Sequence, residues 1–210
     1  MSAASNVHIN GISADTAARA GAAIRDDAER FLLAYEATAA LVTDVRLDDT
    51  ARQEAYAGLV DFVTDHLRRY LAATDRVLYA TAAGAPETRL LVHALRRLRD
   101  ALDRLVDEVV GATTPDQISH TAQTLGAVLV SCLDIERTVL LPALAELPGA
   151  DLPRLADDLY TLLRGGNLDV PDMLDMRSIP HGQRHPRIFG RYARLAPGES
   201  FVLVNSTTSA

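Results

Sequence analysis

The 210-residue sequence contains no lysine and no tryptophan, and its single cysteine is Cys132. One cysteine cannot form an intrachain disulfide or a site of several thiolate ligands, so we expect a reducing, cytoplasmic setting. The N-terminus lacks a basic segment followed by an apolar one, and no apolar run approaches the roughly 18 residues of a membrane span. The sequence therefore predicts neither a secretory signal peptide nor a transmembrane helix.

Positive charge is also scarce, because 21 arginines stand against 28 acidic residues and the net charge is −7. An acidic chain repels phosphate backbones and anionic lipid headgroups, so we expect neither a nucleic-acid nor a membrane partner. Gly-rich phosphate loops, GxSxG and CxxC motifs are all missing from the sequence. We therefore assign no catalytic residue and favour a protein that is not an enzyme.

Apolar residues recur at helical spacing in four long stretches, and a shorter fifth stretch precedes Gly165. The expected helix starts are marked by Asp48, Pro86, Thr114 and Asp151. Amphipathic helices joined by short connections are typical of an up-down bundle. The pattern predicts a mainly α fold, with a flexible tail at residues 1–12 and a four-helix bundle at residues 13–165.

The sequence changes character after Gly166. Short strands are predicted at residues 174–178 and 201–204, with a one-sided helix at residues 188–195 between them. A single β-α-β unit of about 40 residues cannot bury a core by itself. We expect residues 166–210 to be an incomplete α/β module that packs on the bundle or pairs with a second copy.

Two stretches of the chain resemble the hemerythrin-like (HHE cation-binding) family. They are Asp65-His66-Leu67 through Asp75-Arg76-Val77-Leu78-Tyr79, and Glu136-Arg137-Thr138-Val139-Leu140-Leu141-Pro142-Ala143-Leu144. The likeness extends over residues 20–164. It implies a four-helix bundle that holds two irons through inward histidine and carboxylate side chains.

The end of the chain resembles a second family. The motifs are Leu174-Asp175-Met176-Arg177, Arg184-His185-Pro186-Arg187-Ile188-Phe189 and Leu195-Ala196-Pro197-Gly198-Glu199. This family is a small α/β domain of unknown function that is often fused behind hemerythrin-like domains. The resemblance implies a truncated copy of that domain here.

The hemerythrin-like resemblance places the family's histidine ligands at positions that hold other residues in this chain. These positions are Asp27 or Ala28, Tyr70, Leu98 and Cys132, while the family's glutamates fall at Thr74 and Glu136. Iron in such a site needs imidazole and bridging carboxylate ligands, so we expect a degenerate site with no metal and no cofactor. The residual ligand candidates, if a reduced set holds iron or haem, are Glu136, Tyr70, His66, Asp27 and Cys132.

Glu136 is the clearest anomaly in the sequence because it lies in an apolar helical stripe, one turn from Cys132. A buried carboxylate costs several kcal/mol unless it is paired or neutralised. One interpretation is a remnant ligand or a polar anchor for a bound molecule. The other is a glutamate hydrogen-bonded to Tyr70 or His66, or rotated toward Arg137. We expect Cys132 to pack as a small buried residue.

Arg184, His185 and Arg187 cluster at the start of the helix predicted within residues 166–210. Cationic donors at a helix start can bind an anion, and an exposed basic face can also dock onto an acidic surface. We therefore hold these three residues as ligand-binding candidates. Unpaired strand edges in the same module make a homo-oligomer through it a further prediction.

These features together predict a hemerythrin-like protein that has lost its di-iron site and acts as a non-catalytic binding or interaction protein. Its partner would be another protein or a small molecule. The alternative is a metal- or haem-dependent protein of oxygen, nitric-oxide or peroxide chemistry that uses the reduced ligand set. A relative with no selected activity is the third hypothesis.

Overall fold

The computed structural model describes residues 7–44 and 46–168, together with residues 172–175, 184, 188 and 201–204. The chain divides into two compact units, Met1–Gly166 and Asn167–Ala210. The first unit is helical, so the prediction of a mainly α fold is confirmed. Among the described residues, no helix combines the length and the apolar character that crossing a membrane requires.

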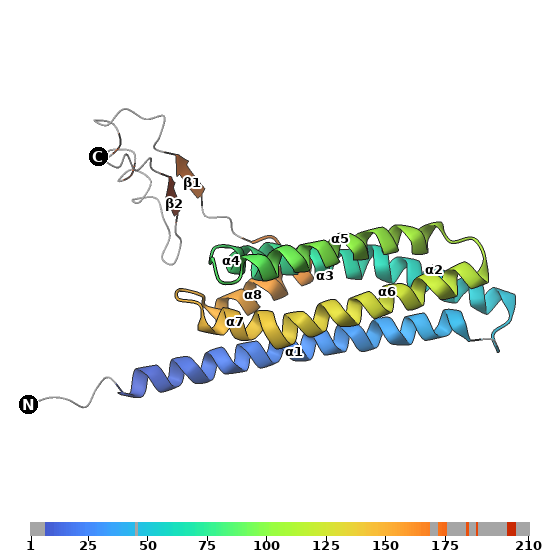
Figure 1. The fold of residues 1–210 in the computed structure, drawn as a ribbon, viewed down its shortest axis with the longest axis horizontal. Coiled ribbons are helices and arrows are strands. Elements are labelled where there is room, and N and C mark those ends of the chain that lie inside the picture. The colour runs from blue at the N-terminus through green and yellow to red at the C-terminus, as the bar shows by residue number, and fades with distance from the viewer. Residues whose placement is uncertain are drawn as a thin grey trace, which may run out of the picture. The chain divides into compact units, whose positions relative to one another are not determined.

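The helical unit is built from five helical segments (Figure 1). The first is α1 (Val7–Thr43). The second is one continuous rod of α2 (Asp49–Asp61), η1 (Phe62–Leu67), α3 (Arg68–Thr74), η2 (Asp75–Tyr79) and α4 (Ala80–Ala83), in which η marks π-helical turns. The third is α5 (Arg89–Gly111), the fourth joins α6 (Pro115–Ile135), η3 (Glu136–Leu140) and α7 (Leu141–Glu146), and the last is α8 (Leu152–Leu163).

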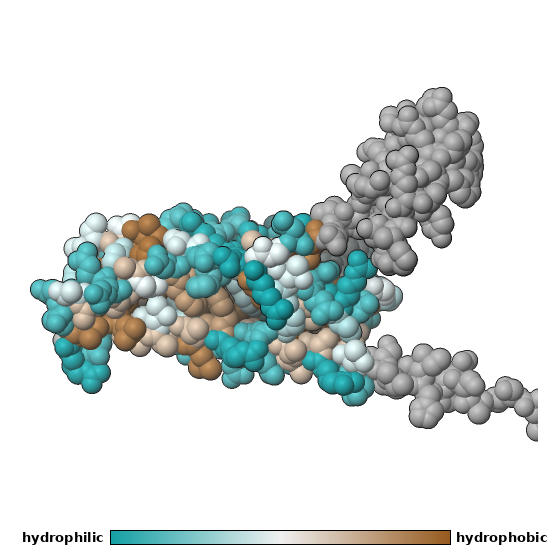
Figure 2. All heavy atoms as spheres, turned by 180° about the vertical axis from the view of Figure 1, so that it is seen from behind, coloured by the Kyte–Doolittle hydropathy of each residue, from teal (hydrophilic) through white to brown (hydrophobic). Residues whose placement is uncertain are grey.

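The segments pack side by side around a shared core. Helix α1 lies against α2, α6 and α8, and α5 lies against α6. The buried stripe of α1 includes Ile24, Ala28 and Tyr35, as its helical spacing predicts. Figure 2 shows that polar and apolar side chains are mixed on the outer surface of this unit.

Most helix starts follow the predicted capping residues. The side chains of Asp48, Thr114 and Asp151 accept hydrogen bonds from backbone N–H groups in the first turns of α2, α6 and α8. The prediction of Pro86 at the start of a helix is wrong, because α5 begins at Arg89. Its N-cap, Thr88, donates its hydroxyl to the Ala82 and Ala85 carbonyls, and these bonds hold the preceding turn.

The N-terminal boundary also differs from the prediction. Helix α1 begins at Val7, inside the stretch 1–12 that was predicted to be a flexible tail. The stretch from Val7 onward contains no proline, and extending an existing helix fixes one further residue for each added hydrogen bond. A long helix therefore propagates beyond the first residue of its apolar stripe.

The third helical segment shows a second difference. Sequence spacing predicts Leu98 as a buried central residue of α5, but it is only half-buried. The buried residues of this helix are Val92, Leu95, Leu102, Val106 and Val109. The neighbouring Arg99 faces η2 instead, where Asp75 accepts from Arg96 Nε at 2.7 Å and pairs with Arg99 Nη1 at 2.9 Å.

In the second unit, the described strands are β1 (Asp172–Asp175) and β2 (Phe201–Val204). They pair in parallel with Asp172 opposite Phe201, as a β-α-β connection requires. Strand β1 begins two residues before the predicted strand at 174–178. The helix predicted at 188–195 lies outside the described residues, apart from Ile188.

Candidate functional site

A buried carboxylate lies at the centre of the helical unit. Glu136 is the first residue of η3 and is 2% exposed. Tyr70 Oη donates to Glu136 Oε2 at 3.0 Å, and Tyr79 Oη donates to Glu136 Oε1. Cys132 Sγ lies 4.0 Å from the same Oε1 atom and 3.9 Å from Tyr79 Oη. We call Glu136, Tyr70, Tyr79 and Cys132 the Glu136 cluster.

Burial controls the protonation of the Glu136 cluster. It raises the pKa of Glu136 to about 7, although the hydrogen bonds from Tyr79 and Tyr70 oppose this rise. Burial and the nearby carboxylate raise the pKa of both phenols well above the usual value, and the pKa of the Cys132 thiol rises to about 12. Glu136 is therefore the one member of the cluster that titrates near neutral pH.

The π-helical turns bring Tyr70 and Tyr79 to the same carboxylate. In a regular α-helix, two residues nine positions apart point in directions about 180° apart. A π turn absorbs one extra residue, which reduces the separation to about 80°. Tyr79 is the last residue of η2 and Glu136 is the first residue of η3, so two of the three π turns lie at the cluster. A helical wheel drawn with regular spacing misses Tyr79 for this reason.

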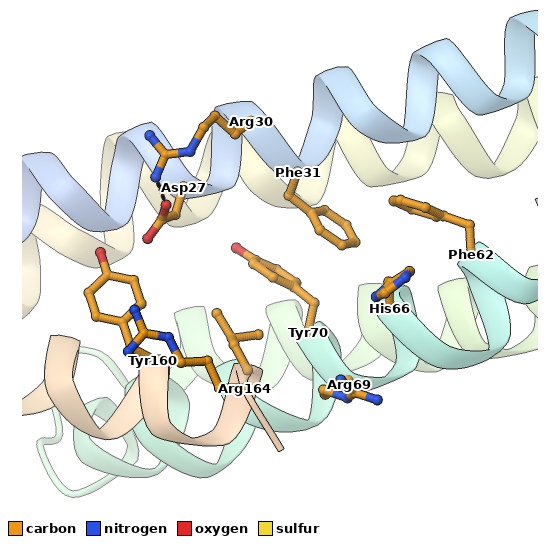
Figure 3. A pocket seen from close by; sticks show the side chains of 10 residues that line it. Asp27, Arg30, Phe31, Phe62, His66, Arg69, Tyr70, Tyr160 and Arg164 are labelled. Atoms are coloured by element: carbon orange, nitrogen blue, oxygen red, sulfur yellow. Dashed lines mark ion pairs between the residues drawn. The ribbon is translucent and has the colours of Figure 1, made fainter. Parts of the chain in front are cut away.

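The third π turn borders an open cleft beside the cluster. The cleft has a volume of about 690 Å³, and its lining comes from α1, η1, α3 and α8 (Figure 3). The aromatic part contains Phe31, whose ring stacks on Tyr70 at 4.7 Å between centroids, and Phe62, whose centroid is 5.4 Å from that of Phe31. Because Tyr70 also bonds Glu136, one side chain joins the cleft to the buried carboxylate.

The other end of the cleft is polar. Figure 3 shows Asp27, Arg30, Tyr160 and Arg164 gathered away from Phe62 and His66. Asp27 forms an ion pair with Arg30. Within the part of the chain that the structure describes, the side chains of Tyr160 and Arg164 make no hydrogen bond or ion pair. The cleft thus combines an aromatic wall with donors that have no protein partner among the described residues.

The Glu136 cluster differs from the two-iron site that the hemerythrin-like resemblance implies. Both oxygens of its only carboxylate accept from tyrosine hydroxyls, and the cluster contains no imidazole. Burial and the nearby carboxylate raise the pKa values of the phenols and the thiol, so a metal ion would have to displace their protons in order to bind them. Among the described residues, no group of three or more histidine, cysteine, aspartate or glutamate side chains could hold a metal ion. The donor set does not fit a di-iron centre.

The structure separates the predicted ligand candidates into two groups. Tyr70, Cys132 and Glu136 come together in the buried cluster. Asp27 and His66 line the cleft instead. His66 is exposed, and its ring centroid lies 5.5 Å from that of Phe62. The prediction of an internal hydrogen bond from His66 is therefore wrong. The hydrogen bond expected between Tyr70 and Glu136 is present.

The remaining candidates belong to the second unit. Arg184 is half-buried, while His185 and Arg187 lie outside the described residues. Sequence reasoning missed Tyr160 and Arg164, which α8 contributes to the cleft. Their spacing of four residues places them on one helix face, but only tertiary packing shows that this face meets α1 and α3.

Comparison with known proteins identifies a family only at the end of the chain. Residues 173–207 match the family described as "Uncharacterized conserved protein (DUF2249)". This match confirms the predicted likeness of this stretch to a family of unknown function. No curated protein and no solved structure matches the chain. The hemerythrin-like resemblance of residues 20–164 stays a prediction.

Proposed function

We propose that the helical unit is a hemerythrin-like four-helix bundle that has lost its di-iron site and acts as a non-catalytic binding protein. Four long helical segments succeed one another along the chain, with a fifth short helix behind them. Glu136 occupies the position of a family carboxylate, and tyrosines take the place of metal at its two oxygens. The hydrogen bonding of both Glu136 oxygens is the observation that carries this proposal.

The tyrosine hydroxyls satisfy the buried Glu136 carboxyl without a metal. A carboxylate buried without partners would cost several kcal/mol, and two hydroxyl donors offset much of that cost. A metal ion would have to displace both tyrosine hydroxyls from Glu136 and deprotonate neighbouring groups before it could bind. The tyrosine hydroxyls thus bind both oxygens of the carboxylate, as a metal ion would in a two-iron site.

The cleft beside the cluster supports the binding function. Its volume of about 690 Å³ suits a small molecule, and its lining combines aromatic rings with a few polar groups. The chain's single thiol, Cys132, is buried, and its raised pKa makes it a poor nucleophile. These properties favour binding over covalent chemistry.

Iron loading tests the proposal. The purified chain is incubated with ferrous iron without oxygen, exposed to air and desalted, and its iron content and visible spectrum are measured. We expect a colourless protein with far less than one iron per chain. About two irons per chain with an oxo-bridged absorption band would contradict the proposal.

One observation favours a second candidate, a single-iron site. Two phenols, a carboxylate and a thiol converge on one point at Tyr70, Tyr79, Glu136 and Cys132. These residues would hold an iron that supplies redox chemistry toward oxygen, nitric oxide or peroxide. The same loading experiment separates the two, because this site predicts about one iron per chain and a tyrosinate band. That band would be weakened by Tyr70→Phe and by Tyr79→Phe.

A further inference from the structure

We infer that the cleft between α1, η1, α3 and α8 binds a small aromatic carboxylate, with the anion at Arg164 and the ring against Phe31 and Phe62. This inference rests on the proposed binding function and names the class of ligand. Three features of the cleft lead to this inference. They are the charge of its lining, its exposed aromatic rings, and the location of the charged and aromatic groups at opposite ends of the cleft.

The charge of the cleft lining favours an anionic ligand. The lining contains Arg30, Arg69 and Arg164 but only one acidic residue, Asp27, in a chain whose net charge is −7. Asp27 is already paired with Arg30, and Arg69 is paired with Asp65 at 2.5 Å. Arg164 is exposed and makes no ion pair within the described part of the chain. Its guanidinium is therefore the cation of the cleft that is free to bind a carboxylate in a bidentate arrangement.

A hydroxyl donor accompanies the guanidinium. Tyr160 lies on α8, four residues before Arg164, which directly follows this helix, and both side chains line the same end of the cleft (Figure 3). The Tyr160 hydroxyl keeps its proton at neutral pH, because burial only raises a pKa that is already about 10 for a free tyrosine, and it can therefore donate to a carboxylate. A half-buried phenol without a partner among the described residues is available to an acceptor on a ligand.

The rings select an aromatic body for the ligand. Phe31 and Tyr70 form a stacked pair with an interplanar angle of 17°, and Phe62 and His66 continue the row of rings. Phe31 and Phe62 are only half-buried, so part of each side chain is open to a ligand. Offset stacking and edge contacts between aromatic rings contribute about 0.5–1.5 kcal/mol each beyond the area that they bury.

The ligand class can be tested with 2-naphthoate and its neutral analogue 2-naphthamide, by calorimetric titration of the full chain. We expect the naphthoate to bind and the amide to bind about tenfold more weakly, since a hydrogen bond to a charged group is worth more than a neutral one. Arg164→Gln should weaken naphthoate about tenfold and leave the amide unchanged. Phe62→Leu should weaken both probes. Arg89→Gln, which removes an exposed arginine of α5 outside the cleft, should change neither.

The outcomes separate this inference from the proposed function. Equal affinity for naphthoate and naphthamide, or naphthoate binding that Arg164→Gln leaves unchanged, would overturn the ligand class. Absence of any naphthoate binding up to millimolar concentration would overturn it as well. None of these results bears on iron loading, which tests the lost metal site separately. Thermal unfolding of each variant shows whether a lost affinity reflects a lost fold.

Discussion

Replacement of Glu136 by glutamine should remove a pH-dependent loss of stability. In the folded chain the pKa of Glu136 is raised from 4.5 to about 7, because burial disfavours its charged form. The folded state therefore binds a proton that the unfolded state has already released between these two pH values. By proton linkage, the contribution of Glu136 to the free energy of unfolding falls as the pH rises through this window and is constant outside it.

The size of the effect follows from the pKa difference. One pKa unit corresponds to 1.36 kcal/mol, so the rise to about 7 makes the ionisation of Glu136 cost about 3 kcal/mol above neutral pH. Glutamine has a similar shape and can bond both tyrosine hydroxyls, but it does not ionise. We expect Glu136→Gln to gain about 3 kcal/mol relative to the wild type between about pH 4.5 and pH 8.

Urea unfolding at several pH values measures this difference directly. All other titrating groups are common to both proteins, so their contributions cancel in the comparison. Glu87→Gln, which changes an exposed carboxyl, controls for the loss of one negative charge. A stability difference between wild type and Glu136→Gln that is independent of pH would refute the reasoning. It would mean that Glu136 ionises in the folded chain as readily as in the unfolded one.

Further predictions concern the cluster, the core and the domain boundary. Tyr79→Phe leaves Glu136 Oε1 without its donor and should cost about 1–3 kcal/mol in urea unfolding, and an unchanged stability would contradict the hydrogen bond. Leu95→Ala should cost ~2–5 kcal/mol because the side chain is fully buried, whereas the half-buried Leu98→Ala should cost clearly less. If the Leu98 variant proves the less stable of the two, the register of α5 is wrong. A shortened chain ending at Gly166 should remain helical and unfold cooperatively by circular dichroism, and aggregation of this chain would show that residues 167–210 complete its core.

Local sequence signals predicted much of the helical unit. Capping at Asp48, Thr114 and Asp151 depends on contacts within a few residues, so the sequence alone places the starts of three helices. Leu98 shows where such reasoning stops. Its stripe is apolar on both sides, but the inward face of α5 is formed by Val92, Leu95, Leu102, Val106 and Val109, which leaves Leu98 at the edge of the core. Packing against other helices, which the local pattern does not contain, makes this choice.

The candidate site was predictable in part for the same reason. A carboxylate within an apolar stripe predicts a buried polar partner, and the sequence offers Tyr70 as one. It does not point to Tyr79, because the π turn η2 changes the angular position of this residue on the helix. The cleft itself depends on the packing of α8 against α1 and α3, which no single helical pattern contains.

The infrared absorption of the Glu136 carboxyl tests the central claim most directly. The protein is labelled with ¹³C at the glutamate side chains, and the spectrum of Glu136→Gln is subtracted from that of the wild type at about pH 6, below the pKa of about 7. We predict the carbonyl band of a protonated, hydrogen-bonded carboxyl, which remains unchanged when ferrous iron and air are added. A carboxylate band alone would show that Glu136 is ionised below neutral pH, and loss of the carbonyl band on addition of iron would show that Glu136 binds metal. Either result would contradict the account.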